Sequence, residues 1–203
     1  MKASFLVGVL GAGAAAASLS PQGLIEHHLQ RARRMNVNST AATEVTAGKR
    51  GSLVYLDNGD NCDKDITSAF GFTLGECVVR QNEGHGVKYA SCFYDTGNVV
   101  FTITECSDEF CQEGCVDHMM VESKQCTYGP EPYNGQIVCA ANVDAYTNYE
   151  QLTLTSKEYF GGDEDCSGQY GYWSSQAMTC TDDYNRSCNR GNNYYYFETV
   201  CEM

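Results

Sequence analysis

The chain has 203 residues, with 26 acidic and 13 basic side chains, 12 cysteines and 14 tyrosines. Its aromatic content of 11% argues against intrinsic disorder, despite a formal charge of −13. Nucleic-acid binding is disfavoured, because phosphate contacts need a surface rich in Lys and Arg.

The first 17 residues have the pattern of a secretory signal peptide. Met1-Lys2 is a short basic start, and residues 3–17 are an apolar run rich in Ala and Gly that is too short to span a bilayer. Small residues at 15–18 suit a signal-peptidase site. No later run is apolar enough to cross a membrane, so we expect a secreted, extracellular protein without a membrane partner.

Residues 18–50 have the features of a pro-segment. A helix is expected to begin at Pro21 with Ser20 as its cap. Its apolar side is formed by Leu24, Ile25, His28 and Leu29. The sequence Arg31-Ala32-Arg33-Arg34 is the kind recognised by furin/kexin-type proteases, and a second basic pair is Lys49-Arg50. We predict cleavage after Arg34 and after Arg50; the alternative is a surface helix and linker that happen to be basic.

The folded unit is predicted to be residues 51–203, which contain every cysteine and every tyrosine. Residues 1–50 hold six of the 13 basic and two of the 26 acidic side chains. Residues 51–203 therefore carry 7 basic and 24 acidic side chains, a formal charge of −17. This charge favours solubility and attraction of multivalent cations, and disfavours anionic membranes.

The cysteines are expected to form disulfides, because an even number in a secreted chain is typical of a disulfide framework. Nine of them fall into three triplets with similar spacing: Cys62, Cys77 and Cys92, then Cys111, Cys126 and Cys139, then Cys166, Cys180 and Cys201. The other three are Cys106, Cys115 and Cys188. The pairing cannot be deduced from spacing alone.

The triplets indicate an internal repeat. Tyr55 and Tyr159 precede Cys62 and Cys166 by seven positions, and Thr104 takes the corresponding place before Cys111. A strand-like run leads into each of these positions, and another precedes the third cysteine of each triplet. The period of about 50 residues predicts three copies, with two copies as the alternative.

The predicted fold is all-β. The runs are β-branched and aromatic, with turn residues between them, including Asn58-Gly59, Gly84-His85-Gly86 and Asn134-Gly135. The best helix candidate in this region, residues 115–122, is weak. A unit of 50 residues buries too little apolar area to stand alone, so we expect the copies to pack as one sandwich-like body. A trefoil-like barrel and a row of stapled units are the alternatives.

Catalysis has little support, and we predict that the protein is not an enzyme. Residues 51–203 contain only two histidines, His85 in a Gly-flanked turn and His118 beside Asp117, and no nucleophile motif. No cofactor is predicted. Zinc at Cys106, Cys111 and Cys115 is an alternative to disulfides, and calcium in the acidic turns at 57–65 and 163–165 is a weak possibility.

Two Asn-x-Ser/Thr sequences, at Asn38 and Asn185, are candidate glycosylation sites. Tyr172 and Trp173 offer aromatic faces on which sugar rings can stack, although core packing is the commoner role for such side chains.

Three motifs follow one another in the first copy: Asp60-Asn61-Cys62, Gly75-Glu76-Cys77 and Tyr89-Ala90-Ser91-Cys92. An acidic turn ending in Cys, a Gly-x-Cys strand and a Tyr-x-x-Cys strand, in this order, resemble the small secreted cysteine-rich repeat proteins of protists and algae. The resemblance covers residues 52–203 at most and implies no particular activity.

These features favour an extracellular structural or interaction glycoprotein of a cell surface, wall or secreted fibre. Its partners would be further copies of itself or an extracellular polysaccharide. A carbohydrate-binding module and a secreted effector or toxin are the alternatives.

Overall fold

The computed structural model describes residues 21–35, 51–58, 62, 65–79, 84–123, 126–128, 134–142, 154–160, 163–177, 187–191 and 195–201. Within these residues the elements are α1 (Pro21–Met35), β1 (Ser52–Asp57), β2 (Ser68–Thr73), β3 (Cys77–Val79), β4 (Gly86–Asp95), β5 (Asn98–Glu105), β6 (Val116–Ser123), β7 (Thr127–Tyr128), β8 (Asn134–Ala140), β9 (Leu154–Phe160), β10 (Tyr172–Gln176), β11 (Asn189–Arg190) and β12 (Tyr195–Cys201).

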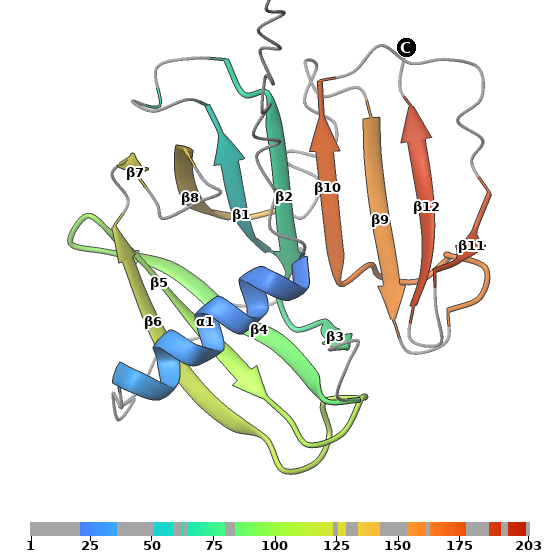
Figure 1. Cartoon of the computed structure of the whole chain (residues 1–203), viewed down its shortest axis with the longest axis horizontal. Helices are drawn as coiled ribbons and strands as arrows, with labels where there is room; N and C mark the ends of the chain where they lie inside the picture. The colour runs from blue at the N-terminus through green and yellow to red at the C-terminus, as the bar shows by residue number, and fades with distance from the viewer. Residues whose placement is uncertain are drawn as a thin grey trace, which may run out of the picture.

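The strands form two antiparallel sheets, which confirms the all-β, sandwich-like prediction (Figure 1). The larger sheet has eight strands in the order β11-β12-β9-β10-β2-β1-β8-β7, and the smaller has four in the order β3-β4-β5-β6. Neither sheet closes into a barrel in the part of the chain that the structure describes, so the trefoil-like alternative is not observed.

The larger of two cores lies between the sheets and includes one side of α1. Its buried side chains come from the helix, from the middle of the eight-stranded sheet and from the four-stranded sheet: Leu24, Ile25, Leu29, Leu53, Tyr55, Phe72, Val78, Val87, Tyr89, Cys92, Val99, Phe101, Ile103, Met120 and Tyr172. Burial of these aliphatic and aromatic side chains is the main force that holds the two sheets together.

A second core lies on the other face of the eight-stranded sheet, around the fully buried Trp173. Successive residues of a strand point to opposite faces, so Val54 and Leu56 enter this core while Leu53 and Tyr55 enter the first. Apolar side chains of β1 therefore pack on both sides of the sheet centre.

The strands fall into three groups that share one order. Each group consists of a short strand, its antiparallel partner, a first long strand and the strand that follows it: β3-β4-β5-β6, β7-β8-β1-β2 and β11-β12-β9-β10. In the third group the long strand β9 pairs with β12, three strands later in the chain. The same order in the other two groups would pair β1 with β4 and β5 with β8. Instead β1 pairs with β8 and β4 pairs with β5, so the first two groups exchange halves. The predicted repeat requires such a correspondence, but the number of copies stays a prediction.

Five disulfides join cysteines that the structure describes: Cys62–Cys126, Cys77–Cys111, Cys92–Cys139, Cys106–Cys115 and Cys166–Cys188. Cys201 is also disulfide-bonded, and Cys180 lies outside the described residues. No described cysteine is free. Such a framework is typical of a protein that folds outside the reducing cytosol.

The disulfides repeat the correspondence between the groups. Cys62, Cys111 and Cys166, the first members of the three triplets, all have left-handed backbone geometry, with φ of 53°, 54° and 53°. Each is bonded to the cysteine at the start of the short strand in its group: Cys126 before β7, Cys77 at β3 and Cys188 before β11. The assignment of Cys180 to the third triplet is therefore wrong in structural terms, since Cys188 takes that position.

Two further predictions need correction. Residues 116–123 form strand β6 rather than a helix, because pairing with β5 overrides the helix preference of Met119 and Met120. Asn134-Gly135 begins β8 instead of forming a turn. A Cβ atom at Gly135 would lie 1.6 Å from the Leu56 carbonyl oxygen, so the close approach of the strands explains the glycine.

The exchange of halves predicts a specific disulfide map. Protease digestion of the unreduced protein and mass spectrometry of the linked peptides should find Cys62 joined to Cys126 and Cys77 joined to Cys111. An unexchanged arrangement would instead join Cys62 to Cys77 and Cys111 to Cys126. The Cys166–Cys188 link is the internal control, because both topologies contain it.

Candidate functional site

The most developed site in the described structure is the place where α1 packs against the two sheets (Figure 1). The predicted apolar side of the helix is confirmed: Leu24, Ile25, His28 and Leu29 are all buried, and the neighbouring His27 and Gln30 are exposed. Pro21 begins the helix, as its fixed φ favours. The helix is therefore part of the core and not an appendage.

His28 lies at the centre of this contact. Its Nε2 is 2.8 Å from the Tyr55 hydroxyl on β1, and its Nδ1 is 3.1 Å from the Tyr89 hydroxyl on β4. Its ring also packs edge-on against Phe101 of β5, with centroids 5.3 Å apart. A neutral imidazole has one donor and one acceptor, so one tyrosine accepts a hydrogen bond from His28 while the other donates one.

The environment of His28 favours its neutral form. Burial is the largest cause that lowers the pKa of the imidazole from its usual 6.5 to about 3, and the nearby cationic groups of His27 and Arg31 contribute to the same shift. His28 is therefore an uncharged, hydrogen-bonded core residue at neutral pH.

Arg31 forms the polar end of the contact through an ion pair with Glu122 of β6. The Arg31 side chain is 41% exposed, so solvent screens the pair and limits its contribution to stability to about 0–1 kcal/mol. Its role is to fix the direction of the helix, whose C-terminal end lies next to β6. We call Tyr55, Tyr89, Phe101 and Glu122 the helix-docking site.

The structure offers no support for a catalytic role of His118. Asp117 and His118 are neighbours on β6 and point to opposite faces, so Asp117 cannot orient the imidazole. The Thr104 hydroxyl donates a hydrogen bond to Asp117 instead, at 2.6 Å. His118 lies 3.7 Å from a Glu105 carboxylate oxygen, which is longer than a hydrogen bond. His85 precedes β4 and is half-buried.

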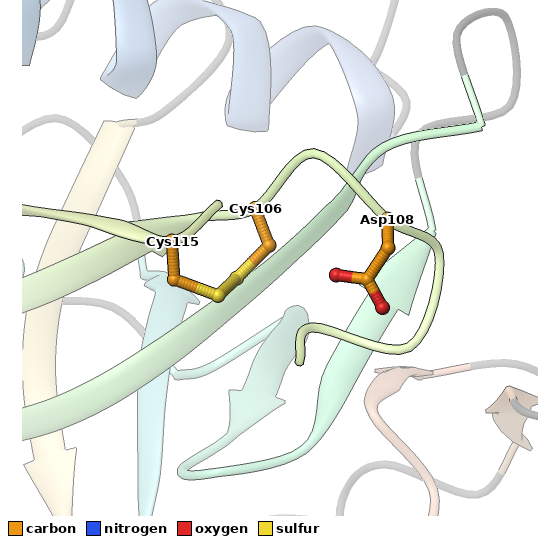
Figure 2. Close-up of side chains that lie close together, drawn as sticks. All are labelled: Cys106, Asp108 and Cys115. Carbon is orange, nitrogen blue, oxygen red and sulfur yellow. A yellow bond between two sulfur atoms is a disulfide. The ribbon is translucent and has the colours of Figure 1, made fainter. Parts of the chain in front are cut away.

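The zinc interpretation of Cys106, Cys111 and Cys115 is wrong, because all three sulfurs are in disulfides and none can serve as a thiolate ligand. Figure 2 shows that Asp108 lies beside the Cys106–Cys115 disulfide. Its carboxylate accepts hydrogen bonds from the backbone N–H groups of Phe110, Gln112 and Glu113, and these bonds lower the pKa of Asp108. The loop uses the carboxylate to satisfy its own backbone.

The acidic turn of the third group uses its carboxylate in the same way. Asp163 accepts hydrogen bonds from the backbone N–H groups of Ser167 and Gly168, four and five residues later, as Asp108 does from Gln112 and Glu113. In both loops the aspartate carboxylate satisfies backbone N–H groups of its own turn. Most of the first acidic turn lies outside the described residues.

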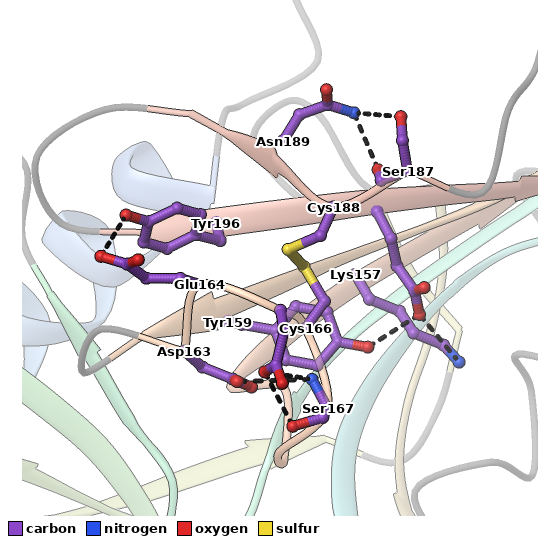
Figure 3. The surroundings of a disulfide bond; sticks show 12 residues. Lys157, Tyr159, Asp163, Glu164, Cys166, Ser167, Ser187, Cys188, Asn189 and Tyr196 are labelled. Carbon is purple, nitrogen blue, oxygen red and sulfur yellow. Dashed lines mark hydrogen bonds and ion pairs between the residues drawn. A yellow bond between two sulfur atoms is a disulfide. The ribbon is translucent and has the colours of Figure 1, made fainter.

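Polar contacts surround the Cys166–Cys188 disulfide of the third group (Figure 3). The Tyr196 hydroxyl donates a hydrogen bond to Glu164, and the Tyr159 hydroxyl donates one to Glu198. Lys157 pairs with Glu198 at 3.8 Å and lies over the Tyr170 ring. The Tyr196 hydrogen bond joins the acidic turn to β12, whereas the Tyr159 hydrogen bond joins β9 to β12.

Trp173 is unavailable for stacking on a sugar. It is 0% exposed, and its indole N–H donates a hydrogen bond to the Ser52 hydroxyl at 3.3 Å. Tyr172 is buried in the core between the sheets. Both side chains have the core role that is usual for aromatic residues in a sheet.

Glu158 of β9 is a second titratable group with a shifted pKa, and its side chain is half-buried. Its register partners are Tyr172 and Phe197, so the three side chains share one face of the sheet. Burial raises the pKa of Glu158 to about 7, because this aromatic surrounding disfavours the charged form.

Of the other predicted site residues, Arg34 lies in the last turn of α1. Arg50, Asn38 and Asn185 lie outside the described residues. Tyr55, Tyr89 and Glu122 were not predicted from the sequence as partners of α1. The available signal was the histidine on the apolar side of the predicted helix, since a buried histidine needs two hydrogen-bond partners.

No family model, curated protein or solved structure matches the chain. The resemblance to secreted cysteine-rich repeat proteins therefore stays a prediction. Among the described residues, no helix is long and apolar enough to cross a membrane.

We predict that Leu29→Ala lowers the free energy of unfolding by about 2–4 kcal/mol, because it leaves a cavity where α1 meets the core. Gln30→Ala is the matched control on the exposed side of the same helix and should change stability by less than about 0.5 kcal/mol. Denaturant unfolding of the full chain measures both. Equal, negligible effects would show that α1 is not docked.

We also predict that Glu158→Gln stabilises the protein above pH 7. The wild-type carboxyl has a raised pKa in the folded state, so the folded state binds more protons and wild-type stability falls as pH rises through about 4.5 to 7. The substitution should add about 3 kcal/mol at pH 8 and nothing at pH 4. Denaturant unfolding at both pH values tests this, and an equal gain at both would contradict it.

Proposed function

We propose that the protein is an extracellular structural or interaction glycoprotein of a cell surface, wall or secreted fibre. In this proposal it is made as a precursor whose α1 segment is a pro-segment. The observation that carries the proposal is the position of α1: the helix fills part of the core, and the basic cleavage sequence lies at its C-terminal end. The signal peptide, both cleavage sites and glycosylation are parts of the proposal that rest on sequence.

The disulfides support an extracellular role. Three of them link residues 64, 34 and 47 positions apart and so join the exchanged halves of the first two groups. Cys92–Cys139 also ties the two sheets to each other. A disulfide that closes a long loop stabilises the folded state by about 2–4 kcal/mol, because it restricts the unfolded chain. This stabilisation lasts only under oxidising conditions.

Strand β6 is the surface best suited to self-assembly. It is an edge strand of eight residues, whereas the other three sheet edges, β3, β7 and β11, have three, two and two. Val116 and Val121 on β6 are 56% and 41% exposed. A long edge strand with exposed apolar side chains is a template for pairing with another chain.

The pro-segment lies against this same strand, through the Arg31–Glu122 ion pair and the core contact near Met120. The helix packs on the face of β6 that carries Met120 and Glu122, whereas Val116 and Val121 are exposed with the helix in place. Departure of α1 after cleavage would therefore add apolar surface beside an edge strand that can pair with another chain. Assembly is thus favoured over a carbohydrate-binding module or a monomeric effector.

We predict that a variant with Arg34→Ala, Lys49→Ala and Arg50→Ala is secreted but stays monomeric, whereas the cleaved protein forms fibres or large oligomers once α1 has left the helix-docking site. Light scattering and negative-stain microscopy of the same secreted samples measure this. Lys64→Ala, which removes a basic residue outside both cleavage sequences, is the control. Normal assembly of the uncleavable variant would refute the pro-segment role, and a cleaved protein that has lost α1 and is still a monomer would favour the binding-module or effector alternative.

A further inference from the structure

We infer that α1 stays bound in the helix-docking site after the chain is cut behind Arg34, and that acid then releases it. The processed protein would be a two-chain complex, with an amphipathic helix as the ligand of the site. The inference rests on the proposed function for the natural cut. The binding itself concerns contacts that the structure describes.

A cut behind Arg34 leaves α1 without a covalent link to the β-sheets, because the first cysteine of the chain is Cys62. It also leaves the described contacts intact. The residues that enter the core or form the ion pair run from Leu24 to Arg31, so all of them precede the cut. The severed helix therefore keeps its complete set of described interactions.

The contacts favour retention at neutral pH. Leu24, Ile25 and Leu29 are 2%, 0% and 0% exposed, and burial of apolar surface is the dominant force in association. His28 adds two hydrogen bonds in a site from which water is excluded. An isolated peptide of this length is only marginally helical in water, so the site also stabilises the helix itself.

The same contacts make retention sensitive to acid. The His28 ring is enclosed by Tyr55, Tyr89 and Phe101, none of which carries a negative charge at acidic or neutral pH. The charged groups nearest on its own helix, His27 and Arg31, are cationic, and Glu122 on β6 is paired with Arg31. A proton on His28 therefore has no compensating carboxylate in these contacts.

The direction in which pH changes the affinity for α1 follows from the difference between the two pKa values of His28. The pKa of docked His28 is about 3 and that of the free peptide is near 6.5, so dissociation takes up a proton at any pH between these values. The affinity of the site for the α1 peptide has its full value above about pH 6.5 and falls about tenfold for each pH unit below it. The expected loss at pH 5 is about 30-fold.

The test uses the secreted full chain, cut in vitro with a furin-type protease and held at pH 7.5 or pH 5. Ultrafiltration followed by mass spectrometry of the filtrate gives the fraction of peptide 18–34 that has dissociated, and its concentration dependence gives Kd. If the natural bond resists the protease, an inserted protease site behind Arg34 gives the same two chains. Failure of the natural cut is thereby separated from failure of retention.

The matched variants are His28→Gln and His27→Gln, on adjacent positions of α1. His28→Gln replaces the imidazole with an uncharged amide that also has a donor and an acceptor, so the 30-fold dependence on pH should disappear. His27→Gln changes an exposed histidine and should keep the dependence. If His28→Gln fails to fold, NMR titration of the wild-type full chain replaces it: His28 should stay neutral down to about pH 4.

Complete release of the peptide at pH 7.5 would contradict the inference that α1 stays bound after the cut. Equally strong binding at pH 7.5 and pH 5 would contradict the inference that acid releases it. A dependence on pH that persists in His28→Gln, or a His28 ring that titrates near 6.5 in the NMR experiment, would show that another group controls it.

Discussion

The pairing of β8 with β1 is the constraint on which the rest of the structure depends. This pairing places β7 and β8 next to β1 and β2, and it brings Cys126 beside Cys62. It leaves β5 free to pair with β4, so that a separate four-stranded sheet forms across from the eight-stranded one. The core that the two sheets share then includes the place where α1 docks. The exchange of halves and the docking of α1 both depend on the pairing of β8 with β1.

The sequence was sufficient for the elements that have a strong local pattern. The apolar side of the helix from Leu24 to Leu29 and the strand runs before Cys62, Cys92 and Cys139 follow from periodicity and composition alone. Residues 116–123 could not be predicted in this way, because their strand conformation depends on a register with β5. The disulfide pairs were equally out of reach, since they follow from the long-range exchange of halves and from a longer connection before Cys188.

The helix-docking site shows the same difference between what a local pattern predicts and what depends on long-range packing. Local pattern identified His28 as a member of a buried side, but its partners Tyr55 and Tyr89 lie 27 and 61 residues away on different sheets. Only the packing of those sheets brings the two hydroxyls within reach of one imidazole. In the two loops that the structure describes, around Asp108 and Asp163, an aspartate carboxylate caps backbone N–H groups four and five residues later in the same loop. This capping depends on the loop conformation, which the acidic composition alone does not predict.

Two titratable groups, the buried His28 and the half-buried Glu158, have opposite effects on the pH dependence of stability. His28 has a lowered pKa, so its contribution to stability is present above about pH 6.5 and is lost as pH falls; Glu158 has a raised pKa, so its contribution is present below about pH 4.5 and is lost as pH rises toward 7. Global unfolding releases both groups, and their effects offset each other between these values. Undocking of α1 releases His28, whereas Glu158 lies on β9, outside the helix-docking site. A nearly flat profile of global stability is therefore compatible with a steep acid dependence of the helix contact, because the switch is local to one element and the disulfides hold the rest.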